Sequence, residues 1–176
     1  MKIPVAGLML SAALVLATGV EARDRIADSP HVRAATPEAA AFVAAAVSRS
    51  QVVGDLARKL EQGNVVAYVH LAPSQPGHAA SALRFAGRST RQRFVVVTIS
   101  SELRADRQVA LLGHELQHVT EISHAAWVSN QADFQSLLSM IGWRDASRAT
   151  GYETSAALLV ERHVAREIGT AGHPTP

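Results

Sequence analysis

A five-residue motif, H-E-x-x-H at positions 114–118, constrains the fold of this chain more than any other feature. Residues four apart lie one above the other on a helix, so the side chains of His114 and His118 can reach one metal ion from the same face. Glu115 points toward the same cleft. Apolar residues recur at helical spacing and predict a packed face opposite the two His: Val109, Leu112, Leu116 and Val119. The motif therefore predicts two metal ligands on one helix, with a carboxylate between them.

The composition narrows the ligands of such a metal ion. The chain has no Cys, which excludes disulfides and thiolate ligands, so His and carboxylate side chains must hold the ion. A catalytic zinc ion takes three protein ligands and leaves a fourth position open for water. His114 and His118 supply two of them, and a third is needed.

His124 and Glu121 are two candidates for the third ligand. His124 matches the metzincin spacing H-E-x-x-H-x-x-G-x-x-H at every position except the Gly, where this chain has Glu121. That Gly lets the chain leave the helix sharply, and Glu121 lacks its conformational freedom. Glu121 itself lies two turns beyond His114, which suits a contact to a ligand or a substrate better than a bond to the ion.

Glu153 is the third candidate and the one that the sequence favours. It opens the last predicted helix, after a break and a short helix that follow the motif. The small residues Ser155, Ala156 and Ala157 would let this helix approach the motif helix closely enough for a carboxylate to reach the ion. Without a metal, Glu153 would be an acid at a helix N-terminus, which the helix dipole favours.

The region 94–168 resembles the zincin metallopeptidases, specifically a minimal gluzincin, whose third ligand is a Glu from a following helix. The resemblance implies that His114, His118 and Glu153 bind Zn²⁺, and that Glu115 is the general base that takes a proton from the attacking water. Gluzincins often carry an Asp four residues beyond the Glu ligand. Here that position is Ala157, so the partner of the first His must come from elsewhere.

The resemblance also implies a substrate cleft. An edge strand above the motif helix would hold a peptide by strand addition, and that strand would belong to the sheet expected within 65–99. Tyr152 and His163 are candidates to stabilise the oxyanion because they lie near Glu153 in the sequence. His163 is equally compatible with a buried position in the last helix.

The pattern of residues along the chain predicts an α+β fold, with a small mixed sheet packed on the motif helix and further helices after it. A helix is expected over 36–60 with Thr36 as its cap, and strands over 65–71, 83–87 and 94–99. The motif helix would follow a cap at Ser100 or Ser101. Helices over 132–141 and 152–168 complete the chain, the latter ended by Gly169. Its inward positions would be Ala156, Leu159, His163 or Val164, and Ile168.

The N-terminus reads as a targeting segment. A positive start at Lys2 is followed by an apolar run over 5–16 and by small residues, which predicts a signal peptide at 1–22 and a single zincin-like domain at 23–176. The run is short for a membrane span, although an uncleaved anchor is the alternative. The expected location is the periplasm or the medium, with no stable membrane span once the signal is removed.

The charge of the chain demands no nucleic-acid partner, because a formal net charge of +2 is mild. Four Arg do crowd together in a stretch that suits a solvated hairpin: Arg84, Arg88, Arg91 and Arg93. The expected partner is a peptide or protein substrate, and the sequence leaves the oligomeric state open.

Three functions fit these features. The first is an exported zinc-dependent metallopeptidase with Glu115 as general base. The second is a non-catalytic envelope protein that keeps a zincin fold as a binding module, against which an intact Glu115 argues. The third is a metal-dependent amidase that acts on a non-peptide or cell-wall amide with the same groups.

Overall fold

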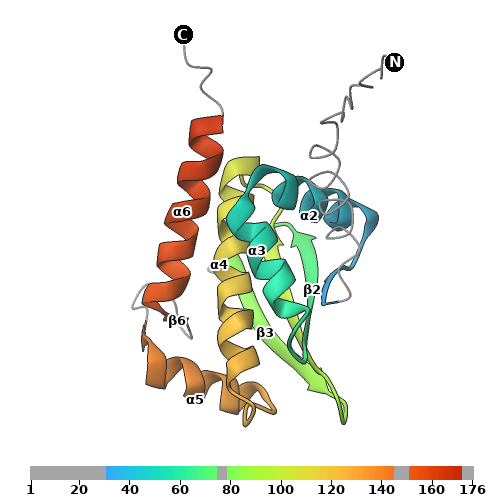
Figure 1. Ribbon diagram of the computed structural model, residues 1–176, viewed down its shortest axis with the longest axis vertical. Helices are drawn as coiled ribbons and strands as arrows, with labels where there is room; N and C mark the ends of the chain where they lie inside the picture. The colour runs from blue at the N-terminus through green and yellow to red at the C-terminus, as the bar shows by residue number, and fades with distance from the viewer. Residues whose placement is uncertain (1–30, 75–78, 145–150, 172–176) are drawn as a thin grey trace, which may run out of the picture.

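The computed structural model describes residues 31–74, 79–144 and 151–171, so the expected signal peptide at 1–22 lies outside the described residues. The fold is mixed α+β, as the sequence predicts (Figure 1). The elements are β1 (Val32–Ala34), α2 (Pro37–Arg49), α3 (Gln51–Leu60), β2 (Val65–Ala72), β3 (Ser81–Arg88), β4 (Arg93–Ser100), α4 (Ala105–His124), α5 (Gln131–Ile141), β5 (Trp143–Arg144), β6 (Tyr152–Glu153) and α6 (Ser155–Ala171). Across the described ranges, none of the helices is both long and apolar enough to span a bilayer.

The main sheet has four strands in the order β1-β2-β4-β3. β2 runs parallel to both β1 and β4, whereas β3 and β4 form the expected antiparallel hairpin and leave β3 at the edge. The three strands predicted from their apolar runs are confirmed, and each is extended by a few residues at most. β1 and the separate two-stranded sheet of β5 and β6 were not expected, since strands of two or three residues carry too little pattern to detect.

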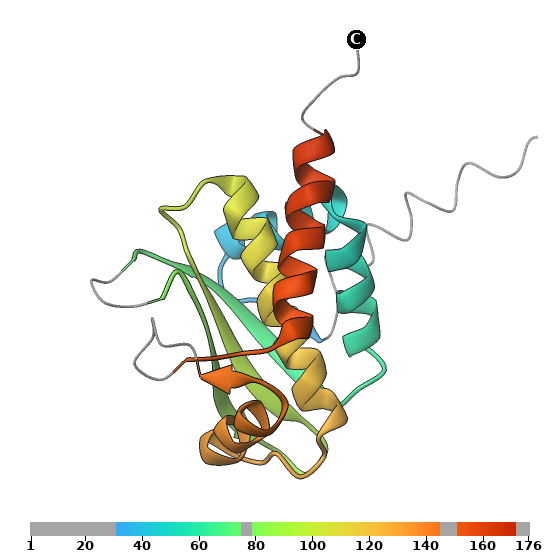
Figure 2. The same cartoon turned by 90° about the vertical axis from the view of Figure 1, so that its left-hand side faces the viewer.

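The helices α3, α4 and α6 lie on one face of the main sheet (Figures 1 and 2). α4 contacts β2, β3 and β4, and α6 and α3 pack along α4. α4 is consequently buried on nearly all sides, so the expectation of one packed face and one free face is wrong: His114 and His118 are only 2% and 3% exposed. α4 and α6 come so close at Gly113 that a Cβ there would lie 2.9 Å from Cγ2 of Val164 and 3.3 Å from Cγ1 of Val160.

Several predicted helix boundaries are wrong. The helix expected over 36–60 breaks at Ser50, which has an extended backbone, ends α2, and caps α3 by accepting a hydrogen bond from the amide of Val53. Its hydroxyl also donates to Glu167 on α6, so the break is held by a contact distant in sequence. α4 begins at Ala105 without a side-chain cap, because Ser100 still belongs to β4.

The last helix departs most from its prediction. It begins at Ser155 rather than Tyr152, and it continues past Gly169. Its buried positions include Ala157, Val164 and Ile168, whereas Leu159 is 50% exposed. The inward stripe is therefore rotated from the expected one, and it includes the partly buried Glu161.

Arg93 anchors the C-terminal end of α4 to the sheet. The sequence suggests a solvated hairpin around this residue, but Arg93 is buried at 5% exposure. Its guanidinium donates to backbone carbonyls at and beyond the end of α4 and to one side-chain amide: Ile122, Ser123, Ala125, Val128 and Asn64. A cation is favoured there because the unpaired carbonyls make a helix C-terminus partly negative. Burial lowers the pKa of Arg93, yet a guanidinium stays charged.

We expect Arg93→Met to lower the free energy of unfolding by about 3–5 kcal/mol, because it leaves buried carbonyls without donors. Urea denaturation followed by circular dichroism would measure the loss. Arg91→Met, in the exposed turn of the same hairpin, is the matched control and should change stability by no more than about 0.5 kcal/mol. Equal midpoints for the two variants would contradict this role for Arg93.

Candidate metal centre

The structure brings the three favoured ligand residues together. His114 and His118 come from the middle of α4, and Glu153 comes from β6. One ligand atom from each residue lies within 4.8 Å of the others, and all three side chains are buried. Nε2 of His114 is 3.3 Å from Oε2 of Glu153. The group is thus compact enough to surround a single ion.

Glu153 reaches this position from a strand, so its predicted place at the start of a helix is wrong. Trp143 on β5 pairs with Glu153 on β6, which fixes the backbone two residues before α6 begins. Gly142 lies against the same backbone: a Cβ at Gly142 would fall 2.1 Å from the carbonyl oxygen of Glu153. Thr154 then turns the chain into α6, since its hydroxyl accepts a hydrogen bond from the amide of Ala157.

His124 and Glu121, the rival candidates, lie elsewhere. α4 continues without interruption to His124, so the chain does not turn back, and His124 is exposed at the helix end. Glu121 instead contacts one of the candidate ligands, with its Oε2 2.8 Å from Nδ1 of His118. Its other oxygen accepts a hydrogen bond of 2.7 Å from the hydroxyl of Thr154. Glu121 therefore links one His to the segment that carries Glu153.

Glu161 takes the place of the partner that Ala157 cannot provide. It lies one turn further along α6, and its Oε2 is 2.9 Å from Nδ1 of His114. The carboxylate is not aligned well enough with the ring to form a regular hydrogen bond, so we treat the contact as mainly electrostatic. Glu161 also pairs with Arg107 of α4. With Nδ1 of each imidazole facing a carboxylate, Nε2 is left to bind a metal.

The charges around the two imidazoles shift several pKa values. Burial alone would lower the pKa of His114, but its contact with Glu161 and the charges of Glu115 and Glu153 outweigh burial and raise it. The contact with His114, assisted by Arg107, lowers the pKa of Glu161 to about 2. Burial opposes ionisation of Glu121, yet its contact with His118 lowers its pKa overall. The carboxylates thus create a strongly negative environment.

Glu115, between the two His, is held by the edge strand of the sheet. The hydroxyl of Ser81 on β3 donates a hydrogen bond of 2.6 Å to Oε1 of Glu115, and both side chains are 2% exposed. No local sequence pattern could have indicated Ser81, because the contact depends on the pairing of β3 with β4. Glu161 did leave a signal: it is an acid in the inward stripe of α6, with Ala157 and Val164 on the same face.

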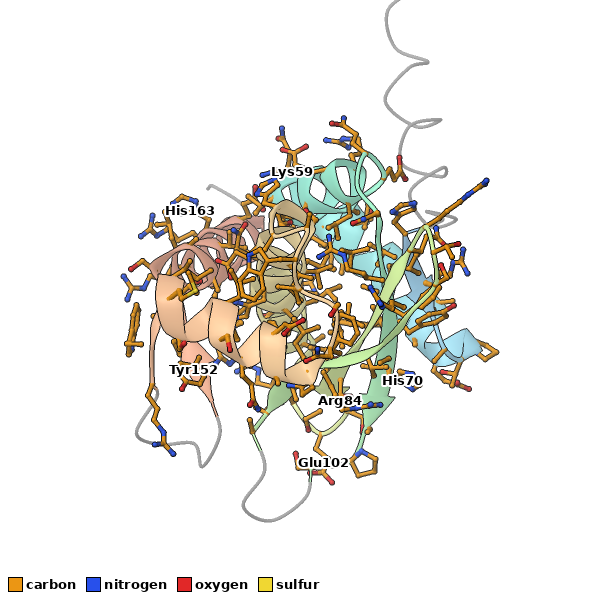
Figure 3. The ribbon with its side chains drawn as sticks, turned by 90° about the horizontal axis from the view of Figure 1, so that it is seen from below. Lys59, His70, Arg84, Glu102, Tyr152 and His163 are labelled. Atoms are coloured by element: carbon orange, nitrogen blue, oxygen red, sulfur yellow. The ribbon has the colours of Figure 1, made fainter. Side chains whose placement is uncertain are left out.

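The two residues considered for oxyanion stabilisation differ in position (Figure 3). Tyr152 is half-buried and adjoins Glu153 on β6. His163 is exposed and points outward from α6, so neither a buried position nor a role beside Glu153 fits it. Only Tyr152 of the two therefore remains a candidate.

The donor set fits a divalent cation. Two imidazoles and one carboxylate are a common set of ligands for a tetrahedral Zn²⁺ ion. Burying a carboxylate costs free energy unless a cation or hydrogen bonds offset its charge. Four acids contact or adjoin the two His: Glu115, Glu121, Glu153 and Glu161. This concentration of negative charge favours a bound metal ion at the point where the ligand atoms converge.

Comparisons of the chain with protein-family models, with curated proteins and with solved structures found no match.

We expect Gly142→Ala to weaken zinc binding at least about tenfold, because the added methyl group must displace the backbone that carries Glu153. Competition with a chromophoric chelator would measure the affinity. The control is Gly169→Ala in α6, where a Cβ would meet nothing within 4 Å. Unchanged affinity in both variants would show that Gly142 does not position the ligand.

Glu161→Gln tests the contact behind His114. Removing the negative charge that orients and polarises this imidazole should reduce zinc affinity by about 10–100-fold while the protein stays folded. The same competition assay applies, with Glu102→Gln as a control at an exposed carboxylate outside the candidate ligand group. An affinity equal to that of the control would assign Glu161 only to its ion pair with Arg107.

Proposed function

We propose that this protein is an exported zinc-dependent metallopeptidase of a minimal gluzincin type. The observation that carries the proposal is the buried group of His114, His118 and Glu153 with Glu115 beside it. A purely structural metal site has no need of an acid at that position. Export rests on the signal-like segment at 1–22, which indicates a periplasmic or secreted protein.

Zinc is the ion that the ligand chemistry supports best. A set of two His and one carboxylate leaves one tetrahedral position open, which is the arrangement of catalytic rather than structural zinc sites. Magnesium and calcium prefer oxygen ligands alone, so two imidazoles disfavour them. Glu121 and Glu161 would orient the imidazoles and increase their basicity toward the ion.

The residues of the site have distinct parts in the proposed hydrolysis. When bound, zinc polarises the scissile carbonyl and makes water acidic enough to be deprotonated near neutral pH. Glu115 would accept the proton from the attacking water and transfer it to the leaving amine. Ser81 would hold one oxygen of Glu115, which leaves its other oxygen for the proton. Tyr152, which adjoins Glu153 on β6, is the residue we propose to donate to the developing oxyanion.

Glu115→Gln tests this proposal. The variant should retain zinc, because Glu115 is not one of the three ligands, and it should lose hydrolysis by several orders of magnitude for want of a base. Zinc content by atomic emission and cleavage of a panel of peptides and casein by mass spectrometry would be measured in parallel. Chelation should abolish the wild-type activity and zinc should restore it.

Zinc stoichiometry in two further variants controls the ligand assignment. Glu153→Ala should lose zinc, whereas His124→Ala should retain one ion per chain. The reverse result would refute the gluzincin arrangement. Full zinc loading with no cleavage of any peptide would favour the non-catalytic binding module, and cleavage of non-peptide amides alone would favour the amidase.

A further inference from the structure

Within the described ranges, β3 has one edge that no other strand pairs with, and this edge lies next to the candidate catalytic group. It is the last strand of the sheet order β1-β2-β4-β3, so only β4 pairs with it within the main sheet. The hydroxyl of Ser81, the first residue of β3, contacts Glu115. An edge strand carries unpaired N–H and C=O groups that can pair with an extended peptide. The free edge of β3 therefore starts at the proposed reaction centre.

The hydrogen bonds show which residues of β3 face this edge. The amide of Ser100 in β4 donates to the carbonyl of Ala80. The backbone N–H and C=O groups of residues 80, 82 and 84 therefore point toward β4. Backbone groups alternate in direction along an antiparallel strand, and so the groups of 81, 83 and 85 point outward. The amide of Phe85 agrees, because it donates to a partner outside the sheet.

That partner is Gln131, at the start of α5. Its side-chain oxygen accepts a hydrogen bond of 2.8 Å from the amide of Phe85. α5 also contacts β3, where Phe85 and Phe134 are both buried. Gln131 thus accepts the hydrogen bond that the amide of Phe85 would otherwise donate to a peptide paired with β3. In the part of the chain that the structure describes, Gln131 takes the outward amide of Phe85 but not those of Ser81 and Leu83.

We propose that Gln131 limits how far a peptide substrate can extend along β3, so that the site selects peptides with a short paired stretch on the amino side of the scissile bond. The inference rests on the proposed function. A peptide paired antiparallel, the more stable arrangement, runs toward its amino end from Ser81 to Phe85. A peptide residue that passes Leu83 gains no hydrogen bond from the amide of Phe85, because Gln131 already accepts that bond.

A series of blocked peptides tests the limit. The peptides share one cleavage site and grow by one residue at a time on the amino side. For wild type, kcat/KM should rise and then reach a plateau. In Gln131→Ala the plateau should come about two residues later, because every second residue of a strand pairs on the same edge, with a further gain of roughly 3–10-fold.

Two variants serve as controls. Gln131→Glu retains an oxygen acceptor for the amide of Phe85 and should keep the wild-type plateau. Gln135→Ala removes an exposed amide one turn further along the same helix and should also keep it. The same plateau in Gln131→Ala and in wild type, or a wild type without a plateau, would overturn the inference.

Amide hydrogen exchange separates this inference from the proposed function. In zinc-loaded Glu115→Gln, the longest peptide of the series should protect the amide of Leu83. The amide of Phe85 should be protected with or without peptide, and in Glu115→Gln/Gln131→Ala it should become protected only with peptide. Hydrolysis with an unshifted plateau refutes the inference alone. Failure of every peptide to bind or to be cleaved refutes both.

Discussion

The close packing of α4 on α6 is the contact on which the candidate site depends. Gly113 makes it possible, because any side chain there would collide with Val160 and Val164. His114 is the next residue of α4, and Glu161 lies between the two Val on α6. The close approach at Gly113 therefore brings His114 of α4 into contact with Glu161 of α6. Of the three small residues expected to permit this approach, Ala157 is buried, whereas Ser155 and Ala156 are exposed.

The site depends on charge as much as on packing. Carboxylates lie at both ring nitrogens of His114: Glu153 faces Nε2 and Glu161 faces Nδ1. Glu121 faces Nδ1 of His118. The helix that bears the imidazoles ends on a buried cation, Arg93, which offsets the negative end of the helix dipole. Electrostatic contacts of opposite sign thus fix α4 at its middle and at its C-terminal end.

The sequence predicts the parts of this fold whose pattern is local. The apolar runs of β2 and β4, the apolar spacing of the motif helix and the cap at Thr36 are signals of this kind. Ser50 and Ser81 carry no such local signal, and Glu161 carries only a weak one, as an acid in the inward stripe of α6. Each acts through a partner distant in the sequence: Glu167, Glu115 and His114 respectively. Glu153 is an intermediate case. The sequence indicated it as a candidate ligand but predicted it at the start of a helix, whereas it lies on β6. Its binding to a metal remains a proposal.

The link from His118 through Glu121 to Thr154 has a consequence for assembly. Contacts between protein groups, together with the β5 and β6 pairing, hold the three candidate ligands near one another. In small zinc domains the ion itself gathers the ligands, so folding and metal capture are one event. Here the hydrogen bonds of Glu121 and the pairing of β5 with β6 would share this task with the ion. Part of the free energy of gathering the ligands would then come from folding of the protein rather than from metal binding.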